Sequence, residues 1–249
     1  MSRPASPARA MLALARMELR LTARRGENVL VTIIVPAAVL VFFATAGVVP
    51  GIAGRPVDFL LPGSLALAVI ASGLVNLGIA TAYERNYGVL KRLGASPLPA
   101  WGLIGAKLVA VLVLEVVQVA LLLTVAVVVL GWTVAPGASI GLFVLAMLLG
   151  TAAFAGLGLL LAGTLRAEAT LALANALFLA FLMVGGIVLP VDHLPTPLDA
   201  IATVLPAAAL SEALRVALGG GGAVGLPLAI LGAWALVTTG LAVRSFRWE

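Results

Sequence analysis

Long apolar runs dominate this chain and alternate with short polar segments. Six runs are long enough to cross a bilayer, whose hydrocarbon core of about 30 Å needs roughly 20 residues of helix. Backbone polar groups inside lipid must be satisfied within the protein, so runs of this kind form helices. We therefore expect an all-α, polytopic membrane protein with six transmembrane helices. The expected spans are Val29–Val49, Phe59–Ala82, Leu108–Leu130, Ile140–Ala162, Ala169–Leu189 and Leu226–Val243.

A seventh apolar stretch, Ala200–Leu218, is interrupted by Pro206 and carries charged residues near its end. Charges are costly to insert at the centre of a membrane helix, which favours a re-entrant or interfacial segment with a short helix at Ala207–Leu218. A true span is the alternative and would place the C-terminus outside. The stretch lies in a long outer segment, residues 190–225. The residues marked in this segment are Pro190, Pro195, Pro206, Glu212 and Arg215.

The fourth expected span carries many small residues. Small side chains let helix backbones approach closely in lipid, so we expect a tightly packed helix inside the bundle. The alternative is that the small face lines a pathway. The residues are Gly150, Ala152, Ala153, Ala155, Gly156 and Gly158.

The N-terminal residues 7–25 are rich in arginine. Their spacing places Arg9, Arg16, Arg20 and Arg24 on one helical face, and apolar residues occupy another. This predicts an amphipathic interfacial helix along the inner membrane surface, with its arginines near lipid phosphates. The alternative is a basic tail that only sets the topology.

The positive charges predict the orientation of the chain. The sequence is 63% hydrophobic and 10% charged, and it holds 15 Lys and Arg residues. With the N-terminus inside, only Arg55 and Arg215 fall on the outer side, which leaves 13 on the inner side. Because Lys and Arg collect in cytoplasmic segments, both termini are expected in the cytoplasm. The net charge of +5 then reflects topology and does not indicate nucleic-acid binding.

Residues 83–98, YERNYGVLKRLGASPL, form a charged amphipathic segment between the second and third expected spans. Its alternating charged and apolar side chains favour a cytoplasmic helix that contacts a soluble partner, rather than a loop that is merely solvated. We expect charged residues to be offered to the partner and apolar residues to anchor it. The candidate contact residues are Tyr83, Glu84, Arg85, Tyr87, Gly88, Val89, Leu90, Lys91, Arg92 and Leu93.

Polar residues inside the expected spans are candidates for a transport pathway. Glu115 lies within the third span, with Gln118 near it on the same face. Ionisable side chains in membranes are costly and face the bundle interior or a water-filled cavity. Glu115 and Gln118, with Asn76 and Asn175, are therefore the pathway candidates. The alternative is helix packing, with Glu115 bonded to one of the other three.

Motifs for chemistry within the chain are few. The sequence has no G-x-x-x-x-G-K-[ST] motif for ATP, no H-E-x-x-H metal motif and no cysteine. Gly137–Gly141 reads G-x-S-x-G, and Ser139 and His193 are both expected on the outer side, so an intramembrane serine hydrolase is a further alternative. A helix N-cap explains Ser139 more simply.

The segment YERNYGVLKRLGASPLPAWGLIGAKL resembles the signature of the ABC type-2 permeases, the membrane subunits of bacterial ABC exporters. The resemblance rests on a Glu-Arg pair, a glycine, a Leu-x-x-Leu element and a Ser-Pro pair, although Asn86 stands where many members have Glu. A second similarity is the outer Leu-Pro series followed by Glu-Ala-Leu-Arg. The matching residues are Glu84-Arg85, Gly88, Leu90–Leu93, Ser96-Pro97, Leu189-Pro190, Leu194-Pro195, Leu205-Pro206 and Glu212–Arg215.

This resemblance implies a single permease domain over residues 1–249 that forms a homodimer in the bacterial cell membrane. The domain would bind a separate ABC ATPase, which holds ATP and Mg²⁺, through a coupling helix matching Tyr83–Leu93. The chain itself would then need no cofactor or metal. The implied activity is export of a lipophilic small molecule or lipid-linked substrate. The competing prediction is a secondary transporter or channel driven by an ion gradient.

Overall fold

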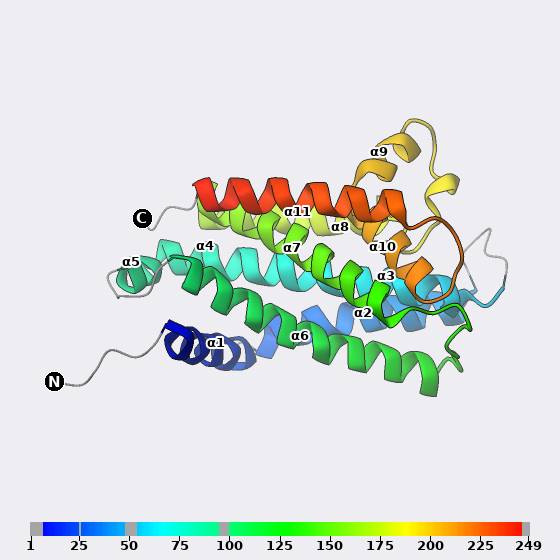
Figure 1. Ribbon diagram of the computed structural model, residues 1–249, viewed down its shortest axis with the longest axis horizontal. Helices are drawn as coiled ribbons and strands as arrows, with labels where there is room; N and C mark the ends of the chain where they lie inside the picture. Colours follow the sequence, from blue (N-terminus) through cyan, green and yellow to red (C-terminus); the bar gives the residue numbers. More distant parts are fainter. Residues whose placement is uncertain (1–6, 25, 48–53, 95–99, 246–249) are drawn as a thin grey trace.

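The computed structural model describes residues 7–24, 26–47, 54–94 and 100–245 (Figure 1). Within these ranges the regular structure is helical and contains no strand, so the predicted all-α fold is confirmed. The helices are α1 (Pro7–Arg24), α2 (Gly26–Ala46), α3 (Pro56–Ile70), η1 (Ala71–Leu77), α4 (Gly78–Asn86), α5 (Val89–Gly94), α6 (Ala100–Val128), α7 (Ile140–Thr164), α8 (Ala167–Val184), η2 (Val191–His193), α9 (Leu198–Val204), α10 (Pro206–Ala217) and α11 (Gly225–Ser245).

The long helices lie side by side along one axis (Figure 1). Five described helices are long and apolar enough to cross a membrane: α3–η1–α4 as one continuous helix, α6, α7, α8 and α11. The first expected span corresponds to α2, whose described apolar part is Thr32–Ala46. The α3–η1–α4 helix is the most buried of the five, whereas α8 and α11 are largely exposed. Apolar faces exposed in this way are compatible with lipid contact.

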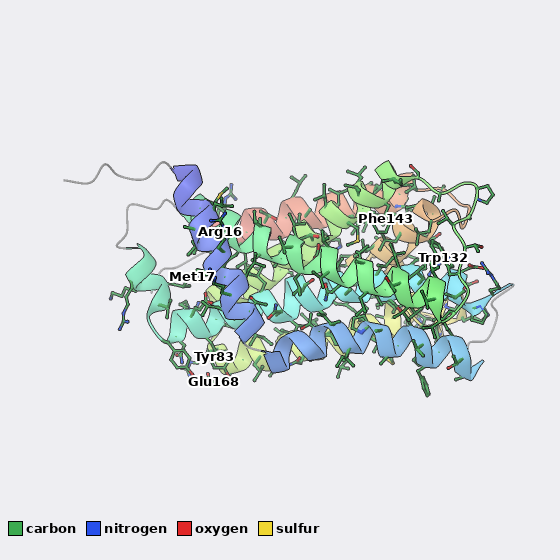
Figure 2. The ribbon with its side chains drawn as sticks, turned by 90° about the horizontal axis from the view of Figure 1, so that it is seen from below. Arg16, Met17, Tyr83, Trp132, Phe143 and Glu168 are labelled. Atoms are coloured by element: carbon green, nitrogen blue, oxygen red, sulfur yellow. The ribbon has the colours of Figure 1, made fainter. Side chains whose placement is uncertain are left out.

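Helix α1 lies across one end of the bundle. Figure 2 shows it, with Arg16 and Met17 labelled, running at a steep angle to the long helices. Arg16 and Arg20 are exposed, and Leu14 and Ala15 are buried. The predicted amphipathic helix is therefore present, and its buried face packs on protein. We call the end with α1 and α5 the α5 end, and the opposite end the α9 end.

The segment before α11 is a bent helix pair. Helix α10 corresponds to the short helix predicted at Ala207–Leu218, and α9, which was not predicted, precedes it. Helices α9 and α10 meet at an angle of 70°. Pro206 is the first residue of α10, where proline is tolerated because that N–H has no partner within the helix. Since the residue before proline avoids the α conformation, Leu205 is extended and α9 ends there.

The fifth expected span ends earlier than its apolar run. We predicted helix to Leu189, but α8 stops at Val184. Gly186 has a φ of 64°, a conformation that glycine adopts readily and that ends helices. Ile187 and Val188 then turn inward and are buried. The apolar character of these residues reflects core packing rather than a longer span.

The small residues of α7 allow close approach to its neighbours. A Cβ on Gly158 would lie 2.5 Å from the Gly73 carbonyl oxygen, and one on Gly156 would lie 2.5 Å from Oγ1 of Thr238. Gly158 therefore contacts η1, and Gly156 contacts α11. These contacts support the prediction that α7 is tightly packed within the bundle.

We predict that Gly158→Ala destabilises the bundle, because the new methyl group meets backbone atoms that cannot move independently. The expected loss is about 1–3 kcal/mol, typical of overpacking, seen as a lower melting temperature of the purified chain in detergent. Gly240→Ala is the matched control, since nothing lies within 4 Å of its added Cβ. Equal melting temperatures for the two variants would contradict the tight contact between α7 and η1.

Candidate functional site

The charged segment 83–98 contains two helices instead of the single coupling helix that we predicted. Helix α4 continues the long central span to Asn86, and Tyr87 and Gly88 form a turn before α5. Gly88 has a φ of 69°, which strongly favours glycine. A positive φ at this position ends α4 and redirects the chain. The side chain of Leu93 and residues 95–98 lie outside the described part.

The exposed face of this segment is smaller than the sequence suggested. Tyr87 is 70% exposed and Val89 is 38% exposed, and both Lys91 and Arg92 are exposed. Among the side chains that the structure describes in α5 and its preceding turn, these four are exposed. Tyr83 is half-buried; its ring lies 6.0 Å from that of Tyr87.

Three candidate contact residues point inward, contrary to our expectation. Glu84 and Leu90 are buried, and a terminal nitrogen of Arg85 donates a hydrogen bond to the carbonyl oxygen of Leu165, just after α7. These residues hold the segment to the bundle rather than facing a partner. The helical period identified the segment as amphipathic, but the buried face includes charged residues.

Glu84 belongs to a buried ionic junction that the sequence analysis missed. The Nζ of Lys107 lies 2.6 Å from Oε2 of Glu84 and 2.9 Å from Oε1 of Glu18. Lys107 is 2% exposed. Because the three residues come from α1, α4 and α6, the junction ties these helices together. The sequence did offer one indication of this junction. Lys107 lies at the edge of an apolar run, and the chain has only 10 acidic residues that could pair with it.

An apolar cluster reinforces the junction. Leu14 and Ala15 of α1 pack with Leu90 of α5 and with Leu103 and Ala106 of α6. Each of these side chains is buried. Helix α5 is thus anchored from behind by α1 and α6, while its outer face stays exposed.

Glu115 forms a second polar cluster, deep in the bundle. One carboxylate oxygen accepts a hydrogen bond from Thr151 Oγ1 at 2.6 Å, and the other from Ser72 Oγ at 3.2 Å. The packing partners proposed from the sequence, Asn76, Gln118 and Asn175, were therefore wrong. Ser72 lies in η1, a π-helical segment, and segments of this kind often occur at functional sites.

The four pathway candidates do not form one site. Gln118 is buried and donates from Nε2 to the Thr32 carbonyl oxygen at 3.1 Å. Asn76 lines a small space beside Glu18 and Lys107. Asn175 is exposed on α8, where its amide donates to the Leu171 carbonyl oxygen. Glu115 is the candidate whose contacts join η1, α6 and α7.

The α9 end holds a cavity of about 640 Å³ between α3, α10, α11 and the loop after α8. Glu212 and Arg215 form an i,i+3 ion pair on α10. Arg215 also donates to the Gly186 carbonyl oxygen at 3.0 Å, and its guanidinium lies 4.1 Å from the centre of the Phe59 ring. Of the marked prolines, Pro190 lines the cavity, Pro195 is exposed and Pro206 starts α10.

Ser139 acts as a helix cap. Its hydroxyl oxygen accepts a hydrogen bond from the Leu142 N–H at 3.3 Å, at the start of α7. The His193 ring contacts the neighbouring Asp192 at 3.2 Å. This arrangement matches the capping role that the sequence favoured over a hydrolase.

A family model described as "ABC-2 type transporter" matches residues 9–218. The chain belongs to the ABC-2 type transporter family. A search of curated proteins found no significant match.

Family membership makes this chain a multi-pass membrane permease component of an ABC-2 type transporter. Members typically lack an ATPase site, and a partner subunit hydrolyses ATP. Among the residues that the structure describes, no group of three His, Asp or Glu side chains is placed to hold a metal.

We predict that Lys107→Met loosens α1, because it removes the cation that pairs with Glu18 of α1 and with Glu84 of α4. Removing one partner from a buried ion pair costs about 3–5 kcal/mol. Hydrogen exchange should therefore become faster across α1. Glu18→Gln should have a smaller effect, since the Lys107–Glu84 pair remains.

Arg20→Met is the control for this test, because it removes an exposed cation from α1 itself. Exchange in α1 should match the unaltered protein. Slow exchange retained in Lys107→Met would mean that apolar packing alone holds α1.

Proposed function

We propose that this chain is the transmembrane subunit of an ATP-driven exporter. It moves a lipophilic small molecule or a lipid-linked substrate out of the cell, with energy from a separate ABC ATPase. On this proposal the whole chain is one permease domain in the bacterial cell membrane. Both termini and the α5 end face the cytoplasm.

The observation that carries this proposal is the construction of α5. The turn and helix present Tyr87, Val89, Lys91 and Arg92 outward, a mixture of aromatic, apolar and basic side chains suited to a protein partner. Leu90 on the opposite face is fully buried. Because α5 is packed against the bundle, a displacement of α5 by a bound partner would be transmitted to the membrane helices. A solvated loop would change its own conformation instead.

The distribution of basic residues supports the proposed orientation. By sequence position, 13 of the 15 Lys and Arg residues fall in the segments expected on the cytoplasmic side, and Arg55 and Arg215 fall in the outer segments. Because positive residues collect on the cytoplasmic side, this distribution supports a position of α5 within reach of a soluble ATPase.

Helix α8 supports association of two copies. It is largely exposed, and its exposed side includes Asn175. An amide facing hydrocarbon retains hydrogen-bonding capacity that a neighbouring helix can satisfy. We therefore propose α8 as part of the interface of a permease homodimer.

The test of the proposed function is site-specific crosslinking from α5 to the ATPase. The chain has no native cysteine, so Val89→Cys provides a unique reactive site. We expect a crosslink to the co-expressed candidate ATPase that changes in yield when ATP is added.

Val134→Cys is the control, because Val134 is 66% exposed near the opposite end of the bundle. It should give no crosslink. Absence of a crosslink at Val89, with the cysteine still labelled from the cytoplasm, would contradict ATPase coupling and favour a transporter driven by an ion gradient.

A further inference from the structure

We propose that the cavity at the α9 end binds amphipathic ammonium compounds, with Asp192 as the counter-ion. This cavity is formed within one copy of the chain, by α3, α9, α10, α11 and residues 186–192. Its volume of about 640 Å³ is within the usual range for sites that bind drug-sized ligands, roughly 300–1,000 Å³.

The cavity has an apolar wall. Phe59 of α3, Val191 of η2, and Leu226 and Ile230 of α11 contribute to it. Such a wall favours a ligand with an apolar body, because covering it removes apolar surface from water. The polar lining then determines what head group such a ligand carries.

The two arginines of the lining are already engaged by protein oxygens. Arg55 bonds to both Asp58 oxygens, to the Gly131 carbonyl at 3.0 Å and to Thr133 Oγ1 at 3.3 Å. Arg215 bonds to Glu212 and to the Gly186 carbonyl, and its Nε is buried without a partner. Neither guanidinium is arranged as an open site for an anion.

The carboxylates give the cavity a negative excess. Its described lining holds three acids, Asp58, Asp192 and Glu212, against two arginines. Asp58 pairs with Arg55 and Glu212 pairs with Arg215. Asp192 also interacts electrostatically with Arg215, but as the third acid it gives the described lining an excess of one negative charge. The Asp192 side chain is 80% exposed and contacts the ring of His193. An exposed acceptor beside an apolar wall matches a ligand with an ammonium group on an apolar body.

The position of the cavity connects it with export. It lies at the end away from α5, where a substrate leaving the cell would emerge. The assignment of the bound compound as a transported substrate rests on the proposed function. The binding site itself does not, because its lining comes from this chain alone.

The binding test uses the full chain in lipid nanodiscs, without an ATPase. The probe is dansylcadaverine, a primary amine with an apolar fluorophore, and the neutral comparison is its N-acetylated form. We expect saturable binding of the amine above the signal from empty nanodiscs. Asp192→Asn should raise its Kd about five-fold, as expected for loss of one partly solvated charge contact. Binding of the acetylated probe, which is weaker, should stay unchanged.

Asp199→Asn is the matched control, since it removes a carboxylate from the same outer segment outside the cavity lining. It should leave both Kd values unchanged. Ile230→Trp should weaken both probes, because the larger side chain fills the apolar part of the cavity.

Two results would overturn the proposal: no saturable amine binding, or the same amine Kd in Asp192→Asn and in the unaltered chain. The outcome is separable from the proposed function. Amine binding without a Val89 crosslink would support the proposed binding site and contradict ATPase coupling. A Val89 crosslink without amine binding would support ATPase coupling and contradict the proposed binding site.

Discussion

One buried ammonium group organises the α5 end of this protein. Lys107 is 2% exposed and lies within 2.9 Å of two carboxylates from different helices. A buried charge is tolerated only when it is paired and hydrogen-bonded, so α1, α4 and α6 must meet at this point. Helix α5 follows α4 after one turn, and its position is therefore set by the same requirement. The exposed face of α5 is the surface that the junction holds in place.

The junction is connected to the rest of the bundle by an uninterrupted helix. Glu84 lies near the end of the 31-residue helix Pro56–Asn86, and Phe59 near its start lines the cavity at the α9 end. Between these two residues, Ser72 of η1 donates a hydrogen bond to Glu115 of α6. Gly73 of η1 also packs closely against Gly158 of α7. A displacement of α5 thus has a mechanical route through packed helices to the opposite end of the molecule.

The sequence predicted those features that depend on local pattern. Apolar run lengths gave the spans, Pro206 marked the bend between α9 and α10, and the Arg-rich start gave α1. The tertiary contacts could not be predicted from the sequence. A polar residue within a span indicates that it has a hydrogen-bonding partner, but not which residue that partner is. Glu115 was identified as a candidate pathway residue, but its partners Ser72 and Thr151 were not. Glu84 was predicted to lie at the surface, because its pairing with Lys107 depends on how α4 and α6 pack. The cavity likewise depends on segments far apart in the chain.

The fixed position of α5 relative to α1, which the Lys107 junction and the apolar cluster behind α5 imply, is tested most directly by a distance measurement. Spin labels at Leu12 and Val89, both exposed, would be introduced into the cysteine-free chain and diluted with unlabelled copies beside the ATPase. The account predicts one narrow distance distribution that is the same with and without ATP, and a broad one when Lys107→Met is added. A distance that shifts with ATP while Lys107 is intact would contradict it.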